Sequence, residues 1–207
     1  MRFDVRPARP GDRDRLYEIC LLTGDAGGDA TAVHDDPDLL GDIYVGPYLE
    51  LSPELAFVLV ADDDVPVGYV LGVADTAAFE AACVAHWWPA MRERHPLGIS
   101  PEGSRDAGLI TLIHQRPADP AELIVDHPAH LHVDLLPAAQ GQGYGRLLLE
   151  HLFGALRDRG VPGVHLGVGA ANTRATAFYR HLCFRTLEAD DQGALLGLDL
   201  RSRASAG

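Results

Sequence analysis

The chain has 207 residues, 47% of them apolar, and a formal net charge of −13 at pH 7. Its length fits one domain with a sizeable core, and it has neither an apolar run near the ~20 residues of a membrane span nor the apolar start of a signal peptide. The negative charge excludes a typical nucleic-acid-binding surface, and it serves either solubility or the attraction of a cationic partner. The three cysteines have no metal-ligand spacing, which indicates a protein of the reducing cytoplasm.

The N-terminal part predicts one strand and two helical regions. The strand covers 3–7, and Asp12 is a suitable N-cap for the helix that follows, whose apolar residues recur at helical spacing. A second helical region is expected from about 38 to 51, where Pro47 should kink or break it.

The middle of the chain predicts a hairpin and then an insertion. Segments 56–61 and 66–73 are almost continuously apolar and are joined by three aspartates, which indicates two strands of a sheet covered on both faces. Residues 76–129 then form a mainly helical insertion that contains Trp87 and Trp88. We expect these tryptophans to lie in the core or to line a groove.

The most informative stretch is a strand, a glycine-rich turn and a helix in direct succession. His130–Leu136 alternates polar and apolar residues like a strand, Gln140–Gly145 holds three glycines, and the following leucines fit one apolar helix face. Glycines let a ligand approach the backbone, and a helix N-terminus offers unpaired N–H groups that bind phosphate or pyrophosphate. The chain contains no lysine, which excludes a nucleotide P-loop, and Arg146 stands where a dinucleotide fingerprint needs glycine.

A second motif lies about 30 residues further on. The strand 164–168 precedes the helical stretch Asn172–Phe184, and segments 183–188 and 194–200 predict a final hairpin before a loose tail at 201–207.

Together these motifs resemble the GNAT superfamily of acetyl-coenzyme A-dependent N-acetyltransferases. Gln140, Gly143 and Gly145 fit its Q/R-x-x-G-x-G pattern, and Asn172–Phe184 fits N-x-x-A-x-x-F-Y-x-x-x-G-F except that Cys183 replaces glycine. The segments Trp87-x-Pro89-x-Met91 and His132-Val133-Asp134-x-Leu136-Pro137 are further similar to the acetyltransferase-like domain at the C-terminus of animal O-GlcNAc hydrolase and to its bacterial stand-alone relatives.

The resemblance implies an α/β GNAT fold. Such a fold has a mixed, mostly antiparallel central sheet with a splayed strand pair, flanked by helices. It would make residues 1–207 a single domain with the insertion at about 76–129, as a monomer or a homodimer.

The resemblance also implies a site for acetyl-coenzyme A. Backbone groups of the splayed strand would meet the pantetheine arm and the acetyl carbonyl, the glycine turn would hold the pyrophosphate, Asn172 would contact the pantetheine, and Tyr179 would protonate the leaving thiolate. Tyr179 could instead be a packing residue. The cofactor-binding residues expected in this way are Val133, Leu135, Leu136, Gln140, Gly141, Gln142, Gly143, Tyr144, Gly145, Arg146, Asn172 and Tyr179.

The acceptor side is less defined by the sequence. His130, His132 and Asp134 share one strand face, so His132 or Asp134 could take the proton of an amine acceptor, or the two could form a structural pair. Zinc bound by these histidines is a further alternative, although acetyl transfer needs no metal. The acceptor is a small-molecule or peptide amine, which Asp25 and Asp29 could attract if they are not merely solvated. The competing hypothesis is a non-catalytic module that binds coenzyme A or a peptide.

Overall fold

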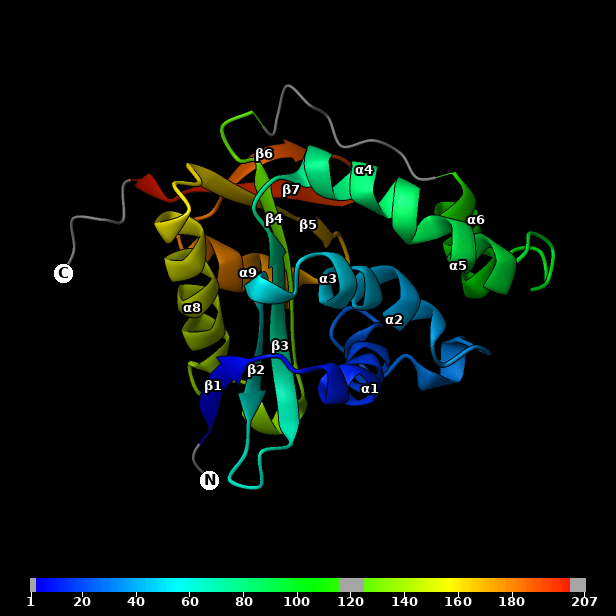
Figure 1. The fold of residues 1–207 in the computed structure, drawn as a ribbon, viewed down its shortest axis with the longest axis horizontal. Coiled ribbons are helices and arrows are strands. Elements are labelled where there is room, and N and C mark those ends of the chain that lie inside the picture. The colour runs from blue at the N-terminus through cyan, green and yellow to red at the C-terminus, as the bar shows by residue number, and fades with distance from the viewer. Residues whose placement is uncertain (1–2, 116–124, 202–207) are drawn as a thin grey trace.

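In the computed structural model, which describes residues 3–115 and 125–201, seven strands form one sheet in the order β1-β2-β3-β4-β5-β7-β6 (Figure 1). The strands are β1 (Asp4–Pro7), β2 (Ala56–Val60), β3 (Pro66–Val73), β4 (Ala129–Leu135), β5 (Gly163–Gly169), β6 (Arg185–Ala189) and β7 (Gly193–Asp199).

The sheet is mixed, because all neighbouring strands are antiparallel except β4 and β5. These two strands pair only at Ala129↔Val164 and His130↔His165, although β4 continues to Leu135 and β5 to Gly169. Beyond the second pair they diverge. The predicted fold, with its splayed strand pair, is confirmed.

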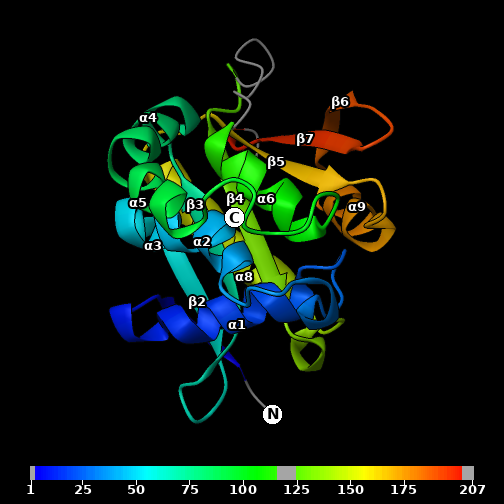
Figure 2. The same ribbon diagram turned by 90° about the vertical axis from the view of Figure 1, so that its right-hand side faces the viewer.

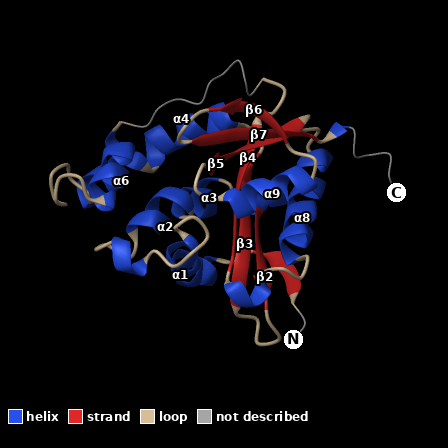
Figure 3. Ribbon diagram, turned by 180° about the vertical axis from the view of Figure 1, so that it is seen from behind, coloured by secondary structure: helices blue, strands red, loops and turns tan. Residues whose placement is uncertain are grey.

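Helices cover both faces of the sheet. Figures 1 and 3 show α8 on one face, with α9 beside it, and α1, α2 and α3 on the other. The helices of the described residues are α1 (Arg13–Thr23), α2 (Leu39–Tyr44), α3 (Gly46–Leu51), α4 (Thr76–His86), α5 (Trp88–Arg94), α6 (Arg105–His114), α8 (Tyr144–Asp158) and α9 (Thr173–His181). None of them is long and apolar enough to cross a membrane.

The alternation of side chains along the strands separates two cores. Tyr69 and Leu71 of β3 pack with α1–α6, whereas Val70 packs on the opposite face with Leu152 and Phe153 of α8. All five side chains are fully buried. Burial on both faces explains why β2 and β3 are almost continuously apolar.

Pro47 and Asp12 were expected to shape the N-terminal helices. Pro47 does separate the second helical region into α2 and α3. Asp12 occupies the predicted N-cap position of α1, but its side chain makes no capping hydrogen bond. Its carboxylate instead accepts hydrogen bonds from the Arg6 guanidinium (2.7 and 2.9 Å) and from the Arg9 N–H (2.7 Å), which take the oxygens that a cap would use.

The predicted insertion contains α4, α5 and α6, which Figure 2 shows in front of α2 and α3. Asp42 of α2, fully buried, accepts hydrogen bonds from Tyr17 (2.9 Å) and His95 (2.8 Å) and thereby links α1, α2 and the end of α5. Trp87 and Trp88 belong to the same core, and the Trp87 indole donates to the Asp42 carbonyl at 2.9 Å. The tryptophans are thus core residues. The predicted tail lies outside the described residues except for Arg201.

Candidate active site

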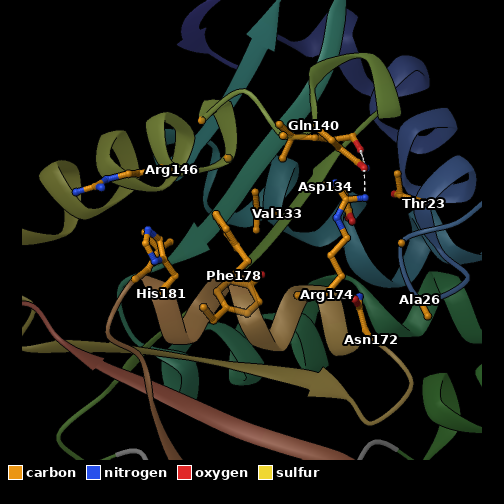
Figure 4. Close-up of a pocket in the computed structure, with 18 residues that line it drawn as sticks. Thr23, Ala26, Val133, Asp134, Gln140, Arg146, Asn172, Arg174, Phe178 and His181 are labelled. Atoms are coloured by element: carbon orange, nitrogen blue, oxygen red, sulfur yellow. Dashed lines mark hydrogen bonds between the residues drawn. The ribbon is translucent and has the colours of Figure 1, made fainter.

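A pocket of about 610 Å³ lies between β4, where it has separated from β5, and α9 (Figure 4). The glycine-rich turn before α8 and the end of α1 with the following turn complete its walls. The lining residues are Thr23, Ala26, Gly27, Val133, Asp134, Leu135, Gln140, Gly141, Gly143, Gly145, Arg146, Asn172, Arg174, Ala175, Phe178, Tyr179, His181 and Leu182.

The backbone of β4 presents alternate residues to the pocket. The Leu136 N–H donates to the Val67 carbonyl of β3 at 2.9 Å. In an antiparallel pair this places the backbone groups of every second residue toward β3 and those of Val133 and Leu135 toward the opposite side, where β5 has diverged. The backbone N–H groups of Val133 and Leu135 therefore face the pocket, whereas the Leu136 N–H is used within the sheet. That these residues bind the cofactor stays a prediction.

The glycine turn leaves room for a ligand at the start of α8. Gly141 (φ 74°) and Gly143 (φ 86°) adopt left-handed conformations that favour glycine, and a methyl group added to either would meet no described protein atom within 4 Å. The first helical hydrogen bond runs from the Leu147 N–H to the Gly143 carbonyl, so the N–H groups of Tyr144, Gly145 and Arg146 have no partner within the helix. Such an N-terminus attracts an anion.

The Gln140 side chain links β4 and α9, which lie on opposite sides of the pocket. Its side-chain amide donates to the Leu135 carbonyl at 2.7 Å, and its side-chain oxygen accepts from Arg174 at 2.7 Å. Figure 4 shows Arg174 reaching from α9 toward Gln140. Arg146 and His181 also line the pocket. Arginines thus gather here in a strongly acidic chain, which favours a phosphorylated ligand.

Asn172 caps α9 at the pocket wall. Its side-chain oxygen accepts from the Ala175 N–H at 3.0 Å, which leaves its amide group as a donor for a ligand.

Tyr179 and Asp134 both line the pocket and carry its candidate proton-transfer groups. The Tyr179 ring contacts Phe178 and Phe184 and is 7% exposed. Burial, and then the charge of Asp134, raise the pKa of Tyr179, so its hydroxyl stays protonated at neutral pH. Burial also raises the pKa of Asp134, although hydrogen bonds from Tyr69 and Thr23 oppose this shift. A raised carboxyl pKa brings Asp134 closer to the range in which a general base is effective.

A buried polar layer supports Asp134 from behind. The Tyr69 hydroxyl donates to the Asp134 carboxylate at 2.6 Å, and Cys20 lies against Tyr69. Burial raises the pKa of Cys20 to about 12, so this thiol is not ionised near neutral pH. The layer fixes Asp134 but offers no nucleophile.

Several predicted site residues lie away from the pocket lining of the described chain. The His132 ring packs 5.4 Å from the Tyr44 ring and 5.2 Å from the Tyr48 ring. Gln142 donates to the Ala138 carbonyl, and the Tyr144 ring packs on Phe3, so only the backbone of Tyr144 can serve the pocket. These side chains are held by neighbours that local sequence spacing does not reveal.

The histidines of β4 do not form a metal site. His130 is bonded to Tyr48 (2.7 Å) and Thr76 (2.8 Å). In the parts of the chain that the structure describes, no three His, Cys, Asp or Glu side chains are close enough to hold a metal ion.

Ala26 and Gly27 line the pocket. The small-residue loop 23–31 was expected, with the insertion, to shape the entrance for the acceptor through the charges of Asp25 and Asp29, but it is the backbone next to them that reaches the pocket. Asp25 is paired with Arg105 at 2.7 Å, and Asp29 accepts from the Thr31 N–H at 2.8 Å. Neither carboxylate lines the pocket of the described residues.

Cys183, the departure from the family pattern, keeps the helix end that glycine would make. It has φ 67°, the Phe184 N–H donates to the Tyr179 carbonyl, and the Cys183 N–H donates to the Arg180 carbonyl. These two bonds define a Schellman motif with a residue other than glycine at its left-handed position.

The fold and the pocket agree with the sequence comparison. Residues 31–184 match the model of the acetyltransferase (GNAT) family, and the chain belongs to this family.

The relatives make the assignment more specific. The chain is 28% identical to protein O-GlcNAcase of Rattus norvegicus over 185 residues, which are 88% of this chain but only 20% of that relative. It is 40% identical over 63 residues, 30% of this chain and 43% of the relative, to the [ribosomal protein bS18]-alanine N-acetyltransferase of Escherichia coli K12. The predicted resemblance to the acetyltransferase-like region of O-GlcNAc hydrolase is confirmed.

Solved structures add two points. The crystal structure of SsHAT has a TM-score of 0.90 and 42% identity, with 97% of this chain and 99% of that chain covered. YncA from Salmonella typhimurium, solved with its cofactor acetyl-CoA, has a TM-score of 0.54 at 16% identity and covers 100% of this chain and 99% of its own. The second likeness shows the fold alone.

Proposed function

We propose that this protein is an acetyl-coenzyme A-dependent N-acetyltransferase that moves an acetyl group directly to an amine. The observation that carries the proposal is the convergence of an open glycine turn, a helix N-terminus, Asp134 and Tyr179 on one pocket. The first two features suit a pyrophosphate, and the last two suit proton transfer.

The cofactor would lie along the splay. Gly143 and the N–H groups of Gly145 and Arg146 would hold the pyrophosphate, while Val133 and Leu135 would offer backbone groups to the pantetheine arm. The Asn172 amide would contact the same arm. When bound, acetyl-coenzyme A supplies an activated thioester whose acetyl group passes to the amine nitrogen.

Asp134 and Tyr179 would divide the proton transfers. Asp134 accepts the proton that the attacking nitrogen loses, and the Tyr69 hydrogen bond holds its carboxylate in place. Tyr179 donates its hydroxyl proton to the departing sulfur as the carbon–sulfur bond breaks. Solvent in the pocket returns a proton to Tyr179 and takes one from Asp134, so that the pair is restored.

Direct transfer is favoured because no cysteine lines the pocket in the described residues. Cys20 is buried with its pKa raised to about 12, and Cys183 is exposed at the end of α9. An acetyl-enzyme on sulfur would need an accessible thiolate beside the thioester. All three cysteines are free thiols, which supports action in a reducing compartment such as the cytoplasm.

The acceptor is an amine on a small molecule or a peptide. The bacterial relative named above acts, by its name, on an alanine of a ribosomal protein, which supports a protein N-terminus as one acceptor class to test. The O-GlcNAcase relative contributes no acceptor, because this chain spans only 20% of it.

The test combines calorimetry with thiol release. Acetyl-coenzyme A should bind the purified protein, and free thiol should appear only when an accepted amine is added. The panel should include peptide N-termini, polyamines and amino acids. Tight binding without thiol release across the panel would favour the alternative, a module that binds coenzyme A but does not catalyse transfer.

A further inference from the structure

The turn that follows α1 forms one wall of the pocket. Ala26 and Gly27 line it, and a methyl group added to Gly27 would lie 4.0 Å from the side-chain nitrogen of Asn172. Figure 4 shows Ala26 beside Asn172, with Thr23 and Asp134 further along the same wall. Thr23, whose hydroxyl donates to the Ile19 carbonyl at 2.7 Å, and Asp134 both line the pocket, so the turn begins two residues after a residue that shares the pocket with the proposed base.

This turn has an unfavourable backbone. Ala26 (φ 51°) and Gly27 (φ 91°) both lie in the left-handed region, and alanine gains nothing from that conformation. Two backbone hydrogen bonds close the turn, from the Asp25 N–H to the Gly28 carbonyl (2.9 Å) and from the Gly28 N–H to the Asp25 carbonyl (2.8 Å). The strain at Ala26 opposes these two hydrogen bonds, so a contact from outside the turn adds to its stability.

The insertion supplies that support. Arg105, the first residue of α6, donates to the Asp25 carboxylate at 2.7 Å, across 80 positions of sequence. The next residue, Asp106, pairs with His34 and accepts the N–H of Asp35 at 2.9 Å. The start of α6 therefore holds the segment between α1 and α2 at two points, one of them beside the pocket.

We infer that Arg105 is a positioning residue, which clamps the Asp25–Gly28 turn and thereby sets the wall against which the acceptor amine is placed. The acceptor part of this inference rests on the proposed function. Asp25 then acts through its ion pair and not by attracting the acceptor. The pyrophosphate is held by the glycine turn and α8, away from this turn, whereas Asn172, proposed to contact the pantetheine arm, lies beside Gly27. The clamp therefore acts more on the acceptor than on acetyl-coenzyme A.

Both partners of the ion pair are about half exposed, Arg105 at 52% and Asp25 at 44%. An exposed pair shifts a local equilibrium by at most about fivefold. We therefore expect Arg105→Ala and Asp25→Ala each to raise the acceptor KM about two- to fivefold, and the KM for acetyl-coenzyme A by less than the acceptor KM. The double variant Asp25→Arg with Arg105→Asp should restore the wild-type acceptor KM.

The matched control is Arg201→Ala. Arg201 forms an ion pair of similar exposure with Asp199 (61% and 44%) outside the pocket, and its loss should leave the acceptor KM unchanged. An unchanged acceptor KM in folded Arg105→Ala and Asp25→Ala proteins, or a charge-swapped protein as impaired as the single variants, would overturn the inference.

A second measurement needs no acceptor. Hydrogen exchange at the Asp25 and Gly28 amides should be about two- to fivefold faster in Arg105→Ala than in wild type, and should be slow again in the charge-swapped protein. Equal exchange in all three proteins refutes the clamp. If exchange responds as expected but the wild type transfers no acetyl group to any amine, the clamp stands and the proposed function, with the acceptor role of Arg105, is refuted.

Discussion

Replacing Gly143 by glutamate tests whether the glycine turn holds the pyrophosphate. The added Cβ would meet no described protein atom within 4 Å, so the new side chain extends into open pocket space. If a pyrophosphate lies there, the carboxylate stands about 4–5 Å from like charges. Each such pair costs between ~1 kcal/mol in water and ~4 kcal/mol near a protein surface. With the volume that the side chain occupies, we expect at least ~3 kcal/mol, or about a 100-fold loss of affinity.

The same substitution also strains the backbone, because Gly143 has φ 86°. Gly160 separates the two effects. It has φ 73°, an added Cβ there also meets nothing within 4 Å, and it lies at the far end of α8. Each of the two substitutions, Gly143→Glu and Gly160→Glu, should lower the free energy of unfolding by about 1–2 kcal/mol relative to wild type.

Calorimetry with acetyl-coenzyme A and urea denaturation measure both quantities for both variants. Only Gly143→Glu should lose affinity. Equal affinities in the two folded variants would refute the placement of the pyrophosphate. A much larger loss of stability at position 143 alone would show that the glycine serves the fold and not the ligand.

The remaining predictions concern Tyr179, Asp134 and Cys183. Tyr179→Phe keeps the ring and removes the hydroxyl, so affinity for acetyl-coenzyme A should persist while kcat falls about 10- to 1000-fold; unchanged kcat on a verified acceptor would make Tyr179 a packing residue. Asp134→Asn should abolish turnover yet raise the Tm at pH 7. Because burial raises the pKa of Asp134 in the folded state, the ionised carboxylate opposes folding above its unfolded pKa, and the gain should vanish in acid, where both states are protonated. A variant that is less stable than wild type at pH 7 contradicts this sign. Cys183→Gly should add about 0.5–1 kcal/mol to the free energy of unfolding in urea, since Cys183 sits at φ 67°, and no gain would mean that this conformation is unstrained.

Sequence reasoning succeeded where structure is specified locally. The glycine turn and the start of α8 each depend on residues within a few positions of one another. A strand followed by a glycine turn and an amphipathic helix has few other conformations available. The alternation along β4 likewise placed Asp134 and Val133 on opposite sides of the strand correctly.

It failed where distant segments meet. The pairing of Leu136 with Val67 depends on the register of β3 and β4, and the pairing of Asp25 with Arg105 depends on how the insertion docks. These two errors came from long-range partners that local spacing does not reveal. Asp12 is a different case, because it stands at the predicted cap position while its carboxylate is taken by local partners, Arg6 and the Arg9 N–H.

The most direct measurement of the central claim follows the acetyl group itself. The wild-type protein, acetyl-coenzyme A with a labelled acetyl group and the amine panel are incubated together, and both the amines and the intact protein are analysed by mass spectrometry. We predict label on the amine nitrogen, an equal amount of free coenzyme A, and no label on the protein at any time. Label retained on a cysteine would contradict direct transfer, and bound coenzyme A with no labelled amine would contradict catalysis altogether.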